Sequence, residues 1–362
     1  MRPGGNSVTE QLGSIVMAAG QGTRMKSDLP KVLHPLLGRT LLNHSMQAVM
    51  GLDPDQIVVV VRHDRDRVAA DAAAVYPAVT IADQDEIPGT GRAVQCALAD
   101  AAAQGSPLTG TVLVTNADVP LLTAQTLRGL LAHHRASGVD VTAVSAVVPD
   151  ATGYGRMIRD GGPDGPLLEV VEHRDATPAQ RDIREINAGI YAFDADFLTR
   201  ALDQIGSDND QGEVYLTDTI ALAATQGRGA DAYVLEDVWQ AEGCNDRAQL
   251  SDLRAELLRR VCRAHQIAGA SIIDPQATSI DVQVKLGRDC VIEPFTVLTG
   301  QTTVEEGSRI EAGSTVINSW IGPGAILKNA YVEDSVVDPG VVLDPYVVLR
   351  SARASADEGN AS

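Results

Sequence analysis

The chain has 362 residues, which at roughly 100 to 200 residues per domain predicts about two or three domains. It carries 29 Lys and Arg against 48 Asp and Glu, a formal net charge of −19, so its surface repels nucleic acids and anionic membranes outside local basic patches. The apolar runs are far shorter than the ~20 residues of a membrane-spanning helix, and the first residues lack the apolar core of a secretory signal. We therefore expect a cytoplasmic protein without a membrane or nucleic-acid partner.

The cysteines and the aromatic residues exclude further classes. Four cysteines are widely spaced and form no C-x-x-C pair, which predicts free thiols rather than a zinc knuckle or a disulfide framework. Aromatic residues make up only 3% of the chain, which disfavours base-stacking platforms and ring-lined carbohydrate modules.

The first two-thirds of the chain alternates short apolar runs with helical patterns. Strands are predicted at residues 14–17, 57–61, 79–82, 111–115 and 141–148. This alternation is typical of an α/β domain with a mostly parallel sheet. Apolar residues at helical spacing, without Pro or Gly, then predict one connecting helix over residues 246–268.

After residue 269 the hydrophobic period changes to about six residues. Single aliphatic side chains recur at Leu286, Ile292, Leu298, Val304, Ile310, Val316, Ile321, Leu327, Val332, Val337, Leu343 and Leu349. A period that is neither 3.6 nor 2 excludes a helix or a simple hairpin series, and it predicts a parallel β-helix of about three to four coils. The small, polar residues 351–362 are expected to form a disordered tail.

The loop after the first predicted strand, residues 18–38, contains the first candidate site. Gly20 and Gly22 lack side chains where backbone N–H groups could approach an anion, and Arg24 and Lys31 add two positive charges. In an acidic chain such a loop suits a polyanion such as a nucleoside triphosphate, although it is neither a Walker loop nor G-x-G-x-x-G. The alternative is an ordinary glycine-rich turn with solvated cations.

Two oxygen-bearing side chains are candidate metal ligands. Asp118 follows the fourth predicted strand, where open α/β sheets bind ligands, and one carboxylate with substrate phosphates is a common Mg²⁺ site. Asn245 follows a turn and could complete the metal shell. The alternatives are helix capping: Asp118 before a helix at 123–134, and Asn245 before the helix at 246–268.

Further segments suggest substrate contacts. A second glycine loop at 88–95 leads into a helix and suits a phosphate or nucleotide, but a plain capped turn explains it equally well. Glu172 and Asn187 lie in short strand-like contexts, where they could hydrogen-bond sugar hydroxyls or could be solvated edge residues.

Taken together, these motifs resemble a known family. The segment MAAGQGTRMKSDLPKVLH is similar to the signature loop of sugar-1-phosphate nucleotidylyltransferases. With QDEIPGTGRAVQ, GYGRM, VEHRDAT, EINAGIY, QGEVYLTD and EGCNDR in the same order, the chain resembles bacterial N-acetylglucosamine-1-phosphate uridylyltransferases over about residues 13–350. The resemblance implies a Rossmann-like nucleotidyltransferase domain over 1–245, the connecting helix, and a left-handed β-helix of hexapeptide repeats over 269–350.

The resemblance also implies roles for individual residues. The expected contacts with the nucleotide are Ala18, Ala19, Gly20, Lys31, Gln84, Gly89 and Thr90, and further expected substrate contacts are Met17, Asn116 and Asn245. The expected sugar contacts are Gly155, Glu172 and Asn187. Asp118 and Asn245 are expected to bind Mg²⁺, while Arg24 and Lys31 stabilise charge on the phosphates.

The implied reaction converts UTP and N-acetylglucosamine 1-phosphate into UDP-N-acetylglucosamine and pyrophosphate, a step of peptidoglycan precursor synthesis, in a homotrimer assembled through the β-helix. Ala117 stands where the family commonly has glycine, and its methyl group is expected to narrow the ligand site. The β-helix is expected to be shortened, without acetyltransferase activity. Two rival functions are a pyrophosphorylase for another sugar or nucleotide and a non-catalytic regulator that binds a sugar nucleotide.

Overall fold

The computed structural model describes residues 11–163 and 165–355, and it divides them into two compact units. One unit comprises residues 11–34 and 40–247, and the other comprises residues 35–39 and 248–355. The expected boundary at 245 thus lies close to the observed division. The connecting helix, however, belongs with the second unit rather than forming a separate segment.

The first unit is built on a nine-stranded sheet with the order β5-β4-β1-β6-β10-β7-β11-β9-β8. Its strands are β1 (Leu12–Met17), β4 (Gln56–Val61), β5 (Thr80–Asp83), β6 (Thr111–Asn116), β7 (Val141–Val147), β8 (Arg156–Arg159), β9 (Leu167–Val171), β10 (Glu185–Asp194) and β11 (Ala230–Val234). Strands β5, β4, β1 and β6 are mutually parallel, whereas β10 runs antiparallel to both β6 and β7. All five predicted strands are confirmed within about two residues at each end.

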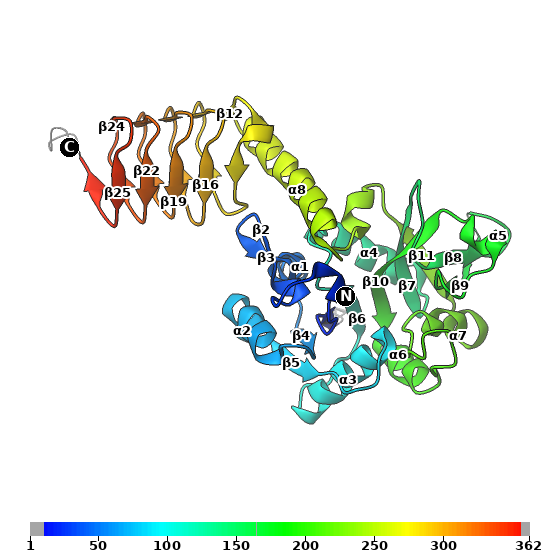
Figure 1. The fold of residues 1–362 in the computed structure, drawn as a ribbon. Helices are drawn as coiled ribbons and strands as arrows, with labels where there is room; N and C mark the ends of the chain where they lie inside the picture. Colours follow the sequence, from blue (N-terminus) through cyan, green and yellow to red (C-terminus); the bar gives the residue numbers. More distant parts are fainter. Residues whose placement is uncertain (1–10, 164, 356–362) are drawn as a thin grey trace, which may run out of the picture. The chain divides into compact units, whose positions relative to one another are not determined.

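Helices cover both faces of this sheet (Figure 1). The helices of the unit are α1 (Leu41–Met50), α2 (Arg65–Val75), α3 (Thr90–Ala103), α4 (Ala124–Ser137), α5 (Pro178–Arg181), α6 (Ala195–Leu202) and α7 (Asp218–Gln226), with short 3₁₀ turns at Thr23–Met25, Lys31–Leu33 and Val238–Ala241. Helices α1, α2 and α4 pack in one hydrophobic core, and α3, α6 and α7 pack in the other. The sheet is therefore buried on both faces, which explains why β4 is a continuous run of Ile and Val.

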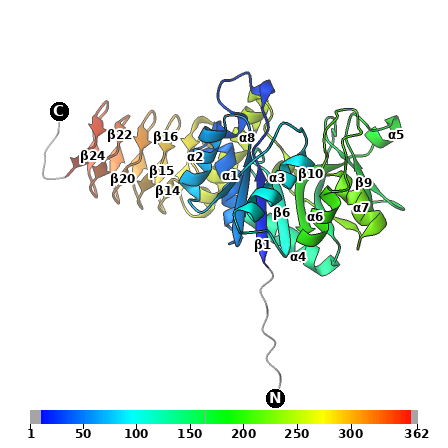
Figure 2. The same cartoon turned by 90° about the horizontal axis from the view of Figure 1, so that it is seen from below.

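The second unit contains a left-handed parallel β-helix of three five-stranded sheets. Its strands are β12 (Ser271–Ile272), β13 (Ser279–Ile280), β14 (Lys285–Leu286), β15 (Val291–Ile292), β16 (Val297–Thr299), β17 (Thr303–Val304), β18 (Arg309–Ile310), β19 (Thr315–Ile317), β20 (Trp320–Ile321), β21 (Ile326–Leu327), β22 (Tyr331–Glu333), β23 (Val336–Val337), β24 (Val342–Leu343), β25 (Val348–Arg350) and β26 (Arg353–Ala354). Figure 1 and Figure 2 show successive coils stacked side by side.

The predicted six-residue period is confirmed, because all twelve aliphatic residues in that pattern lie in these strands. Ile292, Ile310 and Leu327, for example, stack in register and are fully buried. The predicted number of coils was too low: each sheet has five strands. The first coil escaped the pattern because a 3₁₀ turn at Pro275–Ala277 lengthens the spacing between Ile272 and Ile280 to eight residues.

The expected disordered tail is wrong for its first residues. Arg353 and Ala354 form β26, which pairs in parallel with Val336 and Val337. The Arg353 guanidinium also lies 2.7 Å from the Asp338 carboxylate. A small alanine takes the inward position in this strand, so its sequence lacks the usual aliphatic signal. Residues 356–362 lie outside the described part of the chain.

The predicted connecting helix is confirmed as α8 (Arg247–Ile267). Its buried Leu258 and Cys262 pack in the core of the second unit. This unit also includes β2 (Pro35–Leu36) and the following turn up to Arg39, the first residue of β3 (Arg39–Thr40). In this turn Leu37 O accepts a hydrogen bond from Val282 N at 3.1 Å. Among the residues described, no helix is long and apolar enough to cross a membrane.

Candidate active site

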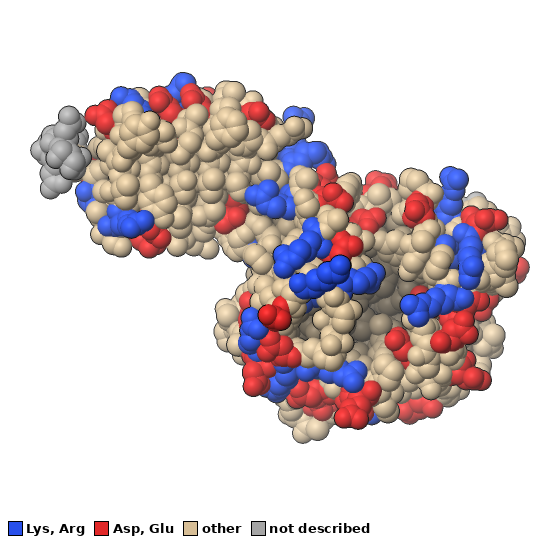
Figure 3. Space-filling view, viewed as in Figure 1, with Lys and Arg blue, Asp and Glu red and all other residues tan. Residues whose placement is uncertain are grey.

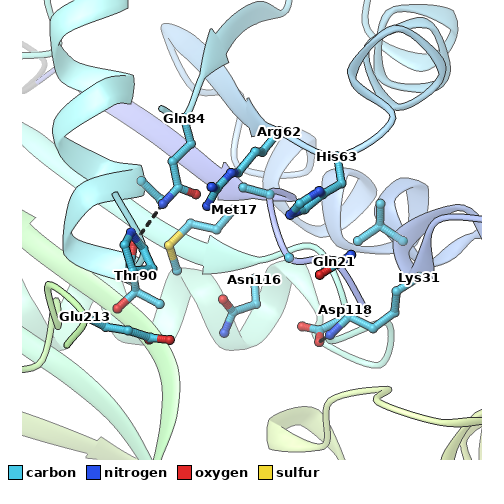
Figure 4. A pocket seen from close by; sticks show the side chains of 16 residues that line it. Met17, Gln21, Lys31, Arg62, His63, Gln84, Thr90, Asn116, Asp118 and Glu213 are labelled. Carbon is cyan, nitrogen blue, oxygen red and sulfur yellow. Dashed lines mark hydrogen bonds and ion pairs between the residues drawn. The ribbon is translucent and has the colours of Figure 1, made fainter. Parts of the chain in front are cut away.

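Four parallel strands of the first unit end at one edge of the sheet, and the residues that follow them line a common cavity. The cavity has a volume of about 280 Å³ and lies next to the switch point between β1 and β6, where the chain connections change direction. Gly20 follows β1, Arg62 follows β4, Gln84 follows β5 and Asp118 follows β6 (Figure 4). Figure 3 shows Lys and Arg side chains gathered around a hollow in this unit, which gives an acidic chain a local cationic surface.

Two glycines shape the loop after β1 in different ways. A Cβ added at Gly20 would contact nothing within 4 Å, so this position leaves open space at the cavity wall. Gly22 has φ +65°, and a Cβ there would lie 2.4 Å from the Lys31 Cβ. Gly22 therefore permits both the left-handed turn and the close approach of Lys31.

The two expected metal ligands come together around Lys31. The Nζ of Lys31 donates to Asp118 Oδ2 at 2.5 Å and to Asn245 Oδ1 at 3.5 Å. Arg24 Nη2 also donates to Asn245 Oδ1, at 2.9 Å. Two carbonyl or carboxylate oxygens from distant parts of the chain thus converge on one cation.

This donor set fits a divalent cation. Carboxylate and amide oxygens are the ligands that Mg²⁺ prefers, and Mg²⁺ usually binds one or two of them together with substrate phosphates and water. The Lys31 ammonium group shows that the two oxygens can face one positive charge. In the part of the chain that the structure describes, no group of three or more His, Cys, Asp or Glu could hold a metal by itself, so substrate phosphates and water would have to complete the shell.

The structure rules out the capping alternative for Asp118. The N-cap of α4 is Thr123, whose side chain accepts a hydrogen bond from Thr126 N. Asp118 instead points into the cavity and is only partly exposed. The alternative for Asn245, capping of α8, stays open beside its contact with Arg24.

A second cavity of about 240 Å³ adjoins the first. The two share Met17, Thr90, Asn116 and Asp118 as lining residues. The second cavity is also lined by Gly155, Glu172, Asn187 and Asn245. Asp118 therefore lies where one cavity passes into the other.

A bulge in β10 places Asn187 at the second cavity. The register of β10 against β7 shifts between Asn187 and Tyr191, with Gly189 at φ +71° inside the shift. Asn187 Nδ2 donates to the Tyr191 hydroxyl at 2.6 Å, and Asn187 Oδ1 accepts from Gly189 N at 3.2 Å. These contacts fix the orientation of the amide. A Cβ at Gly189 would lie 2.5 Å from Asn116 Nδ2, so the bulge needs glycine.

Glu172 also lines the second cavity, in an acidic environment. Burial raises the pKa of its carboxyl group, and the nearby carboxylates of Asp175, Asp218 and Glu213 raise it further. Thr217 Oγ1 donates to Glu172 Oε1 at 3.5 Å and opposes this shift. Its carboxyl oxygens can accept hydrogen bonds from sugar hydroxyls.

The second glycine loop is fixed to the segment before α7. Gly89 has φ +122°, and a Cβ there would lie 2.2 Å from Val214 O. Gly91 N donates to Val214 O at 2.8 Å, and Val214 N donates to Pro88 O at 3.0 Å. The Thr90 hydroxyl accepts from Leu216 N, so it does not cap α3. These bonds bring residues 88–91 to the wall of the first cavity.

Most of the residues implied by the resemblance line one of the two cavities, and two do not. Ala18 is buried in the hydrophobic core, and its N–H donates to Val60 O. Arg24 reaches the site only through Asn245. The expectation for Ala117 was wrong: its methyl group is 1% exposed and packs in the core, because the side chain after Asn116 points to the other face of the sheet.

Several lining residues were not singled out from the sequence. They are Gln21, Arg62, His63, Tyr154, Glu213 and Thr217. Arg62 and His63 directly follow a predicted strand of a parallel sheet. The reasoning that identified Asp118, that ligands bind where parallel strands end, could therefore also have identified them. The Tyr154 hydroxyl donates to Glu242 Oε2 at 2.9 Å, a contact between segments 88 residues apart that no local pattern reveals.

Comparisons with known proteins agree with this architecture. Residues 14–158 match the family model of the MobA-like NTP transferase domain. The bifunctional protein GlmU of Kineococcus radiotolerans is 46% identical over 346 residues, which cover 95% of this chain and 69% of that protein. GlmU of Pseudarthrobacter chlorophenolicus is 45% identical, covering 95% of this chain and 70% of its own. GlmU of Micrococcus luteus is 43% identical, covering 95% and 71%. The matches with these relatives span both units.

Proposed function

Because this chain belongs to the GlmU family of N-acetylglucosamine-1-phosphate uridylyltransferases and is a sugar-1-phosphate nucleotidyltransferase, we propose that it joins UTP to N-acetylglucosamine 1-phosphate. The products are UDP-N-acetylglucosamine and pyrophosphate. The observation that carries this proposal is the pair of adjoining cavities with Asp118 between them, which offers one compartment to each substrate.

In the proposed reaction an oxygen of the sugar phosphate attacks the α-phosphorus of UTP. A new P–O bond forms, the bond to the β-phosphate oxygen breaks, and pyrophosphate leaves with the bonding electron pair. The attacking oxygen is already ionised at neutral pH, so the site needs no general base. Positioning and charge neutralisation must supply the rate.

The chain's own residues divide these tasks. Lys31 and Arg24 neutralise charge on the phosphates, since Lys31 lies beside Asp118 and Arg24 lies beside Asn245. Gln84, Gly89 and Thr90 position the uridine in the first cavity, and Gly155, Glu172 and Asn187 position the sugar in the second. Asp118 and Asn245 would bind Mg²⁺, which supplies Lewis-acid stabilisation of phosphate charge.

Release of pyrophosphate from UTP and Mg²⁺ tests the proposal, with N-acetylglucosamine 1-phosphate, glucose 1-phosphate and glucosamine 1-phosphate assayed in parallel. We expect clear preference for the acetylated sugar. Asp118→Asn should lose at least about a hundredfold in turnover, because the charge that binds the metal is removed. Its melting temperature should fall only modestly, through loss of the ion pair with Lys31. The exposed Asp252→Asn is the matched control.

The other outcomes separate the rivals. Preference for another sugar or nucleotide would favour a different pyrophosphorylase with the same mechanism. Nucleotide binding without turnover for any sugar would favour the regulator. Full activity of the Asp118→Asn variant would contradict the metal-site assignment.

Further predictions rest on the sequence rather than on the site. The flat sheets of the β-helix are a surface on which three copies could pack, and we propose a homotrimer, to be tested by light scattering. The absence of acetyl transfer stays a prediction, which consumption of acetyl-CoA with glucosamine 1-phosphate tests. Action in the cytoplasm and in peptidoglycan precursor synthesis is likewise proposed.

A further inference from the structure

Arg62 is a cation in the first cavity to which the reaction described above gives no role. It follows directly after β4, whose residues Ile57–Val61 are fully buried, so the backbone places it at the ligand-binding edge of the sheet. The side chain is partly buried and lines the cavity together with Gln84 and Thr90. The loop of Gly20 and Lys31, where the phosphates are proposed to bind, lies after a different strand.

The backbone holds Arg62 beside Gln84. Strands β4 and β5 are parallel, with Val61 opposite Asp83, and Gln84 N donates to Val61 O at 2.9 Å. Arg62 and Gln84 are the next residues of the two strands, so their side chains leave the sheet on the same face. Figure 4 shows the two side chains converging over Met17.

Gln84 presents an acceptor to this part of the cavity. Its Nε2 donates to Ile87 O at 3.1 Å and to Gly89 O at 3.2 Å. Both amide hydrogens are thereby used, and rotation of the amide would lose both bonds. Oε1, which can only accept, is the polar atom that remains for a ligand.

Arg62 presents donors next to this acceptor. Its Nη2 donates to Glu86 O at 3.2 Å, which ties the guanidinium to the segment that carries Gln84 and Gly89. Among residues 11–163 and 165–355, no other hydrogen-bond acceptor for Arg62 is found, although its charge contributes to lowering the pKa of the Asp85 carboxyl. An arginine has five N–H donors and no acceptor, so donors remain for a ligand.

The Gln84 acceptor beside the Arg62 donors is complementary to the edge of a base that presents a ring N–H beside a carbonyl oxygen. We propose that Arg62 is a specificity-determining residue, and that with Gln84 it selects a nucleobase with a ring N–H beside a carbonyl, as in uracil, over cytosine. Gln84 Oε1 accepts from the ring N–H, and Arg62 donates to the adjacent carbonyl oxygen. Cytosine presents the reverse, a ring nitrogen acceptor beside an amino donor, and leaves both protein groups unpaired. The inference rests on the proposed function in taking the ligand to be a nucleoside triphosphate.

Calorimetric titration of the full chain with UTP and, separately, with CTP tests this, in the presence of Mg²⁺. The variants are Arg62→Met, which keeps the length of the stem, and Arg62→Lys, which keeps the charge without the planar fork. Arg67→Met is the control, because Arg67 is an exposed neighbour that pairs with Asp64 outside the cavity.

We expect Arg62→Met to weaken UTP binding about tenfold and to leave CTP binding unchanged, so the preference for UTP falls by the same factor. The preference of Arg62→Lys for UTP should lie between those of Arg62→Met and the wild type, and the preference of Arg67→Met should match the wild type. Equal loss for both nucleotides would overturn the proposal and assign Arg62 to the phosphates or to folding. No change for UTP, or a wild type that binds both nucleotides equally, would also overturn it.

The same samples are then assayed for pyrophosphate release with N-acetylglucosamine 1-phosphate. Discrimination that depends on Arg62 in binding, without turnover, would reject the proposed reaction and retain the role of Arg62. Turnover by the wild type, together with an unchanged ratio of UTP affinity to CTP affinity in Arg62→Met, would support the proposed reaction and reject the role of Arg62.

Discussion

Lys31 Nζ lies 2.5 Å from Asp118 Oδ2, so the lysine ammonium group contacts the oxygen that is proposed to bind a metal. Both side chains are mostly shielded, with 14% and 18% of their surface exposed, which makes the attraction stronger than in an open surface pair. The same lysine is proposed to bind the phosphates. Nucleotide binding would therefore draw Lys31 away from Asp118 as it prepares the metal site.

The Lys31 pair predicts competition between the lysine and free metal. Lys31→Met should raise the affinity for Mn²⁺ without nucleotide by at least about tenfold, because one like charge within about 4 Å of the metal is removed. It should also weaken UTP binding. Electron paramagnetic resonance of free Mn²⁺ measures the first effect, and Lys26→Met, in the same loop but exposed, is the control. Unchanged Mn²⁺ affinity in Lys31→Met would contradict the prediction.

Gly89 is predicted to be indispensable to the first cavity. Gly89→Ala combines φ +122° with a Cβ that would lie 2.2 Å from Val214 O, so the paired segments must separate. We expect at least about 2 kcal/mol less stability in denaturant unfolding, and weaker UTP binding. Gly162→Ala has a similar backbone angle, φ +119°, with nothing within 4 Å, and should lose only about 1 kcal/mol. Equal losses in the two variants would show that the contact with Val214 is unimportant.

Tyr154 and Glu242 are predicted to hold the second cavity in shape. The hydroxyl–carboxylate bond of 2.9 Å joins the loop of Gly155 to the loop of Asn245, and burial, followed by the charge of Glu242, raises the pKa of Tyr154. Tyr154→Phe should raise KM for the sugar phosphate severalfold and change kcat less. In a double-mutant cycle with Glu242→Gln the coupling should be about 1 to 3 kcal/mol. Tyr233→Phe, outside both cavities, is the control, and purely additive effects would reject the link.

Ionisation of Glu172 is predicted to lower the stability of the folded protein as the pH rises. Because burial raises its pKa in the folded protein, the folded state binds this proton more tightly than the unfolded state does. That contribution is complete below the unfolded pKa of about 4.5 and is lost as the pH rises through the raised value. Glu172→Gln should therefore melt higher than the wild type by a margin that grows from pH 5 to pH 8, while its KM for the sugar phosphate rises.

The margin in melting temperature is compared with that of Glu236→Gln, in which an exposed glutamate is replaced. A margin that does not change with pH would mean that burial does not raise the pKa of the Glu172 carboxyl. A margin that grows without any change in KM would separate the stability effect from sugar binding.

Local patterns determined both folds of this protein. The apolar run of β4 and the six-residue period from Leu286 to Leu349 each follow from which side chains must be buried in a repeating backbone, and such a rule acts over a few residues. The edge that carries Asp118 followed from the same pattern, since parallel strands end together. The first coil and the last strand of the β-helix lacked the repeating signal and were missed for that reason.

Only the tertiary structure decided which distant residues meet. Asn245 lies 214 residues after Lys31 in the chain, yet Lys31 Nζ donates to both Asn245 and Asp118. Arg62 lies beside Gln84 only because β4 and β5 are parallel and in register. The direction of a single side chain was also beyond the sequence, as the buried Ala117 shows. Contacts of this kind depend on the packing of whole elements, and no spacing along the chain records them.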